Sequence, residues 1–128
     1  MRHSRFSVCL ILAIGIAACH RVQAPVTRRL PSGHEVRVVE IGPMFFSAGK
    51  PALMVMYETK ISVDDVPALR EEAMEIEKQL RSTLNSTGRE WAIFRAHEPQ
   101  RTQRNTVISE SSNFIAKKQA DGTWKLRE

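Results

Sequence analysis

The sequence predicts an α+β domain, with one antiparallel sheet of four or five strands and a single amphipathic helix packed on one face. Three observations lead to this expectation. Strand-like segments flank one long helical pattern, their order is ββαββ, and no internal repeat is present. Parallel neighbours would require more crossover connections than this order provides. We expect residues 34–128 to form one small domain, a length suited to a single core.

The first two strands are expected at residues 34–41 and 52–57. The first segment alternates polar and apolar side chains, whereas the second is an unbroken apolar run. Such a run is typical of a central strand that is buried on both faces, and the first segment is its expected hairpin partner. The connection between them, residues 43–49, is long and unusually apolar for a loop.

The helix is expected from Val66 to Asn85. Its apolar residues recur at steps of three or four, which places them on one stripe against the sheet. Asp64 and Asp65 favour its N-terminus, Pro67 is tolerated only in a first turn, and Gly88 supplies a stop. The buried stripe is expected to contain Leu69, Ala73, Ile76, Leu80 and Leu84.

Two or three strands are expected after the helix. Residues 90–97 form one, residues 100–105 a polar loop, and residues 106–118 a long or interrupted strand. Asp121-Gly122 predicts a tight two-residue hairpin turn into residues 123–126, because these residues accept positive φ. Trp91 and Trp124 are expected to pack between the helix and the sheet, with a role as ligand platforms as the alternative.

The N-terminal segment is typical of a secretory signal. Arg2, His3 and Arg5 precede an apolar run over residues 8–18. At about 1.5 Å per residue this run covers only about half of a ~30 Å hydrocarbon core, so a retained transmembrane helix is disfavoured.

The residues Ile16-Ala17-Ala18-Cys19 resemble the lipobox of bacterial lipoproteins. The resemblance implies that residues 1–18 are removed as a signal peptide and that Cys19 becomes the lipidated N-terminus. An ordinary secretory signal is the alternative. His20 stands where an aspartate would favour retention in the inner membrane, so the resemblance implies an outer-membrane location facing the periplasm. Several acyl chains would make attachment effectively permanent.

Residues 19–33 are expected to form the lipidated N-terminus and a flexible tether. They carry two prolines and lack any helical or alternating period. Their arginines either contact anionic headgroups or are simply solvated.

Composition excludes several functional classes. The formal charge of +5 would fall to about +3 after loss of residues 1–18, too little for a nucleic-acid-binding stripe. Both cysteines lie in the N-terminal segment, which leaves none for disulfides or cysteine catalysis. The histidine spacing predicts no metal site, and the scattered glycines predict no nucleotide cofactor.

Two segments are candidate partner contacts. Met44, Phe45 and Phe46 in the first connection could touch a partner, or could fold inward to close the core. Arg95, His97, Arg101 and Arg104 concentrate positive charge that could recognise an envelope protein or an anionic envelope component, or could form a solvated loop. The oligomeric state stays open.

Three functions remain as hypotheses. The first is a non-catalytic membrane-anchored interaction module, with no catalytic residue and no cofactor. The second is a small apolar-ligand or lipid-binding domain, which predicts an internal cavity of about 300 Å³ or more. The third is a hydrolase using Glu110, His97 or a neighbouring serine. The helix glutamates Glu71, Glu72, Glu75 and Glu77 are expected to form a solvated face.

The folded part is also similar to several small exported bacterial domains of unknown function. The similarity involves a Tyr57-Glu58-Thr59 strand, an Arg70-Glu71-Glu72-Ala73 helix segment and a terminal Asp121-Gly122-Thr123-Trp124 hairpin. It implies no named activity.

Overall fold

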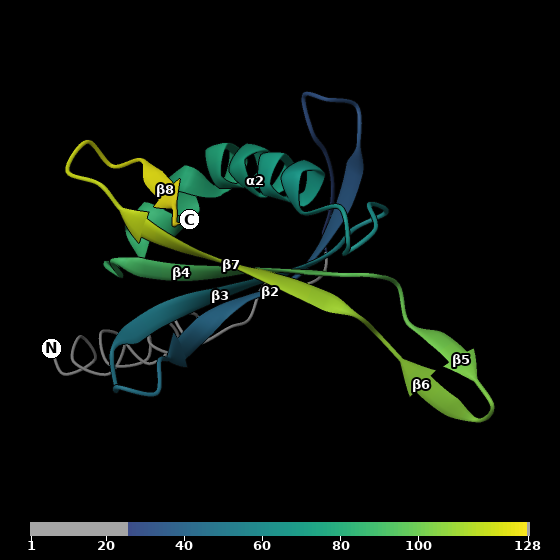
Figure 1. Ribbon diagram of the computed structural model, residues 1–128. Helices are drawn as coiled ribbons and strands as arrows, with labels where there is room; N and C mark the ends of the chain where they lie inside the picture. The colour runs from purple at the N-terminus through teal and green to yellow at the C-terminus, as the bar shows by residue number, and fades with distance from the viewer. Residues whose placement is uncertain (1–25, 128) are drawn as a thin grey trace, which may run out of the picture.

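The computed structural model describes residues 26–127. The predicted signal peptide, Cys19 and the lipobox lie outside these residues. Six strands form one sheet in the order β1-β2-β3-β4-β7-β8, and helix α2 lies across it (Figure 1). The elements of this sheet are β1 (Val26–Arg29), β2 (Glu35–Phe45), β3 (Pro51–Glu58), α2 (Val66–Ser86), β4 (Trp91–His97), β7 (Ser111–Lys118) and β8 (Trp124–Leu126).

The predicted α+β class is confirmed, with one helix and a mostly antiparallel sheet. The expected number of strands was too low, because the sheet has six. The expectation of a purely antiparallel sheet was also wrong, since β3 and β4 pair in parallel. Helix α2 is itself the crossover that this pairing requires, because it returns the chain to the starting end of β3.

Strand β1 lies within the residues that the sequence assigned to the tether. It pairs antiparallel with β2, from Val26 opposite Val38 to Arg29 opposite Glu35. Leu30, directly after it, is 2% exposed and belongs to the hydrophobic core. The folded part therefore includes residues from Val26 onward that the sequence assigned to the tether.

Helix α2 matches its predicted span closely. The Asp65 side chain accepts a hydrogen bond from the Ala68 amide at 3.3 Å, which satisfies one free N–H of the first turn. Gly88 has φ +71°, a conformation that ends the helix without the steric cost that a side chain would impose. The five residues of the predicted stripe are all buried.

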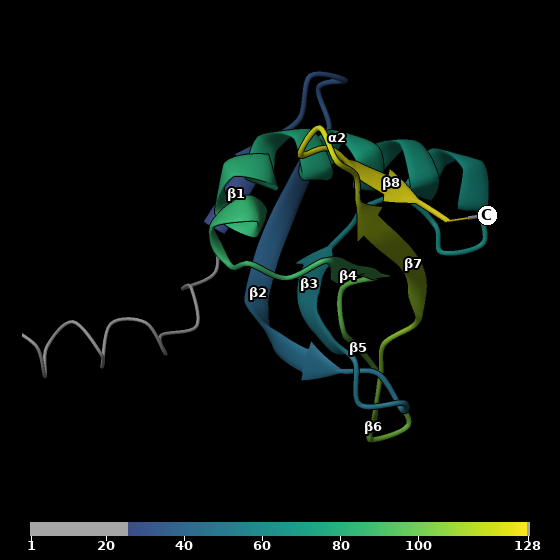
Figure 2. The ribbon, with the colours of Figure 1, turned by 90° about the vertical axis from the view of Figure 1, so that its left-hand side faces the viewer.

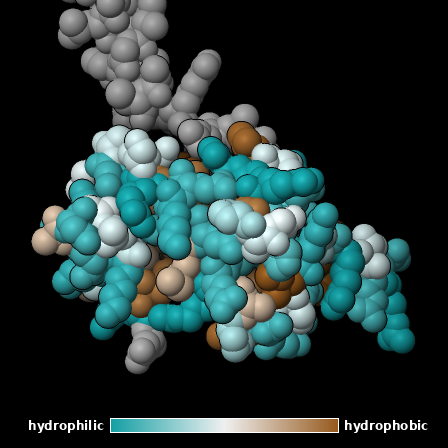
Figure 3. Space-filling model, turned by 90° about the horizontal axis from the view of Figure 1, so that it is seen from above, coloured by the Kyte–Doolittle hydropathy of each residue, from teal (hydrophilic) through white to brown (hydrophobic). Residues whose placement is uncertain are grey.

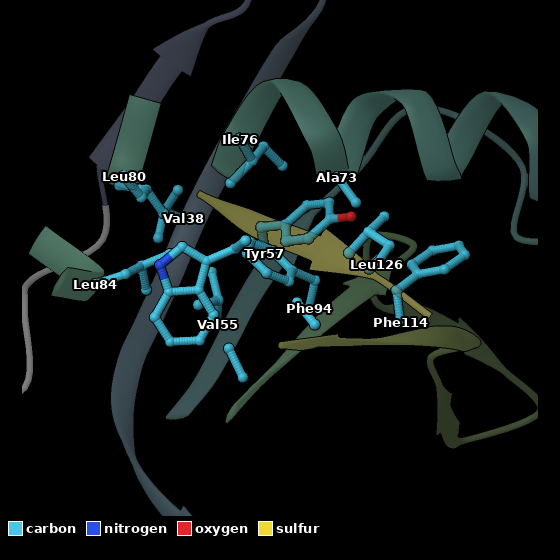
Figure 4. Packing of buried hydrophobic residues seen from close by; sticks show 14 of the residues in the cluster. Val38, Val55, Tyr57, Ala73, Ile76, Leu80, Leu84, Phe94, Phe114 and Leu126 are labelled. Carbon is cyan, nitrogen blue, oxygen red and sulfur yellow. The ribbon is translucent and has the colours of Figure 1, made fainter. Parts of the chain in front are cut away.

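The core lies between α2 and one face of the sheet (Figure 4). Val55 and Tyr57 on β3, Phe94 on β4 and Phe114 on β7 share this face. Trp124 on β8 is 5% exposed, which confirms its predicted position in the core. Seen from the helix side, the surface is mainly hydrophilic, with hydrophobic residues in small separate patches (Figure 3).

Two connections differ from their predictions. The β7–β8 hairpin was expected to have a two-residue turn, but Gln119 and Thr123 pair across three residues, with Gly122 at φ +85°. The expected polar loop after β4 contains β5 (Arg101–Gln103), which pairs with β6 (Thr106–Ile108). This separate hairpin projects away from the body of the domain (Figure 1).

Candidate interaction surface

The sheet face opposite α2, here called the open face, is not covered by any helix or strand of residues 26–127. Core residues alternate with open-face residues along each strand, because successive side chains point to opposite faces. Across β3, β4 and β7, Met54, Ile93 and Ile115 stand in register at the centre of this face. Figure 2 shows α2 on the far side of the sheet from this face.

The centre of the open face is apolar and partly accessible. Met54, Met56 and Ile93 are half-buried, and Ile115 is 38% exposed. A half-exposed sheet face is normally polar in an antiparallel sheet. A contiguous apolar row bordered by polar residues is a feature of surfaces that bind other molecules.

An aromatic and cationic cluster lies at one end of the open face. Phe46 packs edge-to-face on Trp91, with ring centroids 6.1 Å apart and an interplanar angle of 80°. Three cationic groups lie over the Trp91 ring, with distances to its centroid of 5.8 Å for Lys50, 5.3 Å for Lys117 and 5.6 Å for Arg127.

Arg89 adds a fourth cation at this end of the sheet, 6.0 Å from the Phe45 ring. Phe45 has the strand parity of Leu53 and Val55, so this pair lies on the helix side of the sheet. Within residues 26–127, no carboxylate forms an ion pair with any of these four cations. Cation–π attraction at such exposed sites contributes about 0.5–1 kcal/mol each, and it leaves the positive charges free to bind an anion. We call these seven residues the aromatic–cationic end: Phe45, Phe46, Trp91, Lys50, Arg89, Lys117 and Arg127.

Of the two alternatives for the first connection, inward packing is wrong for Phe45, and the predicted packing of Trp91 between the helix and the sheet is also wrong. Phe45 is 66% exposed, and Met44 and Phe46 are half-buried. Strand β2 continues to Phe45, so Met44 and Phe45 belong to a strand, and the tight turn contains residues 46–50. Trp91 has the strand parity of Ile93, which places it on the open face and not against α2.

The opposite end of the open face is polar. Arg95 Nε donates to Asn113 Oδ1 at 2.9 Å, across β4 and β7. His97, opposite Ser111 and Glu58 in the strand register, has its Nδ1 3.1 Å from the Glu98 carbonyl oxygen, and its buried Nε2 lacks a hydrogen-bond partner.

The structure thus gathers only some of the predicted contact residues. Met44, Arg95 and His97 share the open face, although Met44 lies at the aromatic–cationic end and His97 at the polar end. Arg101 and Arg104 are exposed on the β5–β6 hairpin, beyond the polar end. Arg104 and Asn105 form its turn, with φ of 50° and 63°.

The residues considered for hydrolysis lie near one another but lack the hydrogen bonds of a nucleophile and base. Ser109 Oγ donates to the Glu98 carbonyl oxygen at 3.2 Å, and the Glu110 carbonyl accepts from the Glu98 amide. Among the side-chain hydrogen bonds of residues 26–127, none joins His97 to a serine or to Glu110. The geometry required of a general base is therefore not formed here.

Two helix glutamates are buried, contrary to the expected solvated face. Glu77 is 4% exposed and makes two 2.8 Å hydrogen bonds with Arg81. Its Oε1 also accepts from the Trp124 amide at 3.2 Å, which ties α2 to β8. Arg81 follows Glu77 at the i, i+4 spacing that favours such an ion pair, and β8 packs over the Glu77 side chain through the Trp124 amide.

Glu72 is the second buried glutamate, 3% exposed, with Oε2 3.9 Å from His34 Nδ1. Burial raises the pKa of its carboxyl, while a Thr59 hydrogen bond and the His34 charge partly offset this effect. Its Oε1 and the Tyr57 hydroxyl have no hydrogen-bond partner. Burial and the Glu72 charge together raise the pKa of Tyr57.

The larger depressions have mixed linings and open at the surface. One of about 740 Å³ lies beside Trp91, and one of about 410 Å³ lies beside Glu72, His34 and Lys60. Neither is the enclosed apolar cavity that the ligand-binding hypothesis expected. In the described part of the chain, no three metal-binding side chains converge. No helix among residues 26–127 is long and apolar enough to cross a membrane.

Comparison with known proteins adds no relative: no family model, curated protein or solved structure matches this chain.

Proposed function

We propose that this chain is a bacterial envelope lipoprotein, anchored through Cys19, whose folded domain is a non-catalytic interaction module. The domain would be held at the periplasmic side of the outer membrane. Its open face would contact another envelope component. The observation that carries this proposal is the apolar row of Met54, Ile93 and Ile115, which no element among residues 26–127 covers.

Physical chemistry supports binding at this face. Partial exposure of a contiguous apolar row costs free energy, and a partner that covers it recovers about 25 cal/mol per Å² of apolar surface removed from water. Aromatic residues and arginine are the residue types most enriched at binding hot spots, and both are present at the aromatic–cationic end. The apolar row and the aromatic–cationic end together form an apolar surface that is bordered by charged groups.

The lipid anchor is tested by a Cys19→Ala substitution. Cells producing the unchanged protein should yield a chain that begins at Cys19, carries the mass of acyl chains and partitions with the membrane. The variant should lose the acyl mass and the processing that depends on it. An unchanged protein that lacks acyl mass would refute the anchor while leaving the interaction module untested by this comparison.

The interaction module is tested by photo-crosslinking in living cells. A photoreactive amino acid at position 115 should give a discrete crosslinked product, because Ile115 lies in the apolar row. Position 74 is the matched control, since Met74 is an exposed apolar residue of α2 on the other side of the sheet. Equal products from both positions, or none from position 115, would contradict the proposal.

A further inference from the structure

The depression beside Trp91 has the size and lining of a ligand site. Its volume of about 740 Å³ falls within the range of small-molecule pockets. It lies between the C-terminal end of α2 and the first residues of β3 and β4. Its lining combines the Trp91 ring with polar and charged side chains, including Lys50, Thr87, Arg89, Glu90 and Lys117.

The charges of this depression favour an anion. Lys50, Arg89 and Lys117 outnumber the single lining carboxylate, Glu90. Lys50 and Lys117 both lie within 6 Å of the Trp91 centroid, and Arg127 joins them over the same ring. Positive groups gathered on one ring repel one another, and an anion placed among them would relieve this repulsion.

We infer that this depression binds the phosphate of an anionic lipid headgroup in the membrane that carries the protein. This inference rests on the proposed function, since it assigns a partner to one end of the open face. Phosphate oxygens accept charge-assisted hydrogen bonds from lysine and arginine. Trp91 and the exposed Phe45 suit the boundary between headgroups and acyl chains, where aromatic side chains gather.

The membrane is within reach of the domain. Seven peptide units separate Cys19 from Val26, a span of at most about 25 Å. Val26 also lies at the end of β1 that is nearer to Phe45, because it pairs with Val38 whereas Arg29 pairs with Glu35. A lipid on Cys19 would therefore hold this end of the domain close to headgroups.

The test uses the full chain as cells produce it, isolated in phosphatidylcholine bicelles. Phosphatidylglycerol is added stepwise while amide chemical shifts are followed by NMR. Saturating shifts are expected at Lys50, Gly88, Arg89 and Lys117, and none at the β5–β6 hairpin. A second titration adds sn-glycerol-3-phosphate, at the same phosphate concentration, to bicelles that contain only phosphatidylcholine. It should give much smaller shifts.

Two double variants test whether the cations of this depression are the ones that bind the lipid. Lys50→Gln with Lys117→Gln should raise the half-saturating phosphatidylglycerol concentration about thirty-fold, at about tenfold per 1.4 kcal/mol and ~1 kcal/mol per cation. Arg101→Gln with Arg104→Gln removes two cations that are also exposed. This double variant should leave the half-saturating phosphatidylglycerol concentration unchanged.

Three results would overturn the inference: no shifts with phosphatidylglycerol, equal shifts in both double variants, or equally strong saturation by glycerol phosphate. The last would assign the depression to a soluble phosphate ester. Crosslinks from position 115 without any lipid response would leave the interaction module standing and remove this inference alone. A lipid response without crosslinks from position 115 would remove the interaction module and leave lipid binding at this depression standing.

Discussion

At the scale of single residues, the polar groups buried near α2 are the feature predicted least well from the sequence. Glu72 was assigned to a solvated face because it is charged, yet its side chain is 2% exposed. Its position, three residues after Leu69 and four before Ile76, is the spacing of the buried stripe. Its partners come from distant segments, with His34 before β2 and Thr59 after β3. The spacing therefore indicated the burial of Glu72, whereas the partners of its carboxyl depend on the tertiary fold.

Glu72→Gln is expected to stabilise the protein at neutral pH. Burial raises the Glu72 pKa in the folded state, so the folded protein binds a proton more readily than the unfolded chain. Stability then falls as pH rises from the unfolded value towards the folded one, and the cost is fully present above both. Glutamine removes the charge and therefore this cost.

The measurement is urea unfolding of both proteins near pH 7.5 and near pH 3.5. Glu72→Gln should raise the free energy of unfolding at the higher pH by on the order of 1 kcal/mol, and little at the lower pH. Glu71→Gln, on the exposed side of α2, is the control and should change neither value appreciably. Equal destabilisation by Glu72→Gln at both pH values would contradict this account.

Tyr57→Phe is expected to cost little stability. The Tyr57 ring is fully buried between the sheet and α2, with its hydroxyl on the side of Ala73 (Figure 4), and this hydroxyl has no hydrogen-bond partner. Removing an unpartnered buried hydroxyl ends its desolvation cost and leaves the ring packing in place. Thermal unfolding should give an unchanged or higher midpoint, and a loss above about 1 kcal/mol would indicate a hydrogen bond to the hydroxyl.

At the scale of elements, local sequence signals predicted the helix and its ends correctly, whereas the pairing of the strands was predicted incorrectly. The helix, its Asp65 cap and its Gly88 stop were predicted, because all three depend on neighbouring residues. The parallel pairing of β3 and β4 was missed, because it depends on which end of the sheet the chain reaches after α2. Trp91 was assigned to the wrong face for a related reason: periodicity shows that faces alternate, but it does not show which face the helix covers.

The contact between α2 and β8 gives a prediction at this scale. Asn85 Oδ1 accepts from Trp124 Nε1 at 2.8 Å, and Asn85 Nδ2 donates to the Gly122 carbonyl at 3.0 Å. Asn85→Ala removes both bonds and leaves a largely buried indole N–H without a partner. Chemical denaturation should show a loss of about 1–3 kcal/mol. Ser82→Ala, on the exposed helix surface, should cost under about 0.5 kcal/mol.

At the scale of the whole molecule, α2 covers one face of the sheet, and no other element of residues 26–127 covers the opposite, open face. The sequence named Met44, Phe45, Phe46, Arg95 and His97 as contacts because of their chemistry, and the topology places Met44, Arg95 and His97 on the open face. It did not suggest Met54, Ile93 or Ile115, because apolar residues in strands are ordinarily assigned to the core. Lys50, Lys117 and Arg127 were missed too, since they converge on Trp91 only after the strands pair.

The central claim, that the open face is covered by a partner in the envelope, is tested most directly by cysteine accessibility. Residues 20–128 contain no cysteine, so Ile115→Cys and Met74→Cys each introduce a unique thiol into the folded part. A maleimide should label both thiols at similar rates in the purified protein. In intact envelopes, labelling at position 115 should become at least several-fold slower than at position 74. Equal rates at the two positions in intact envelopes would contradict the claim.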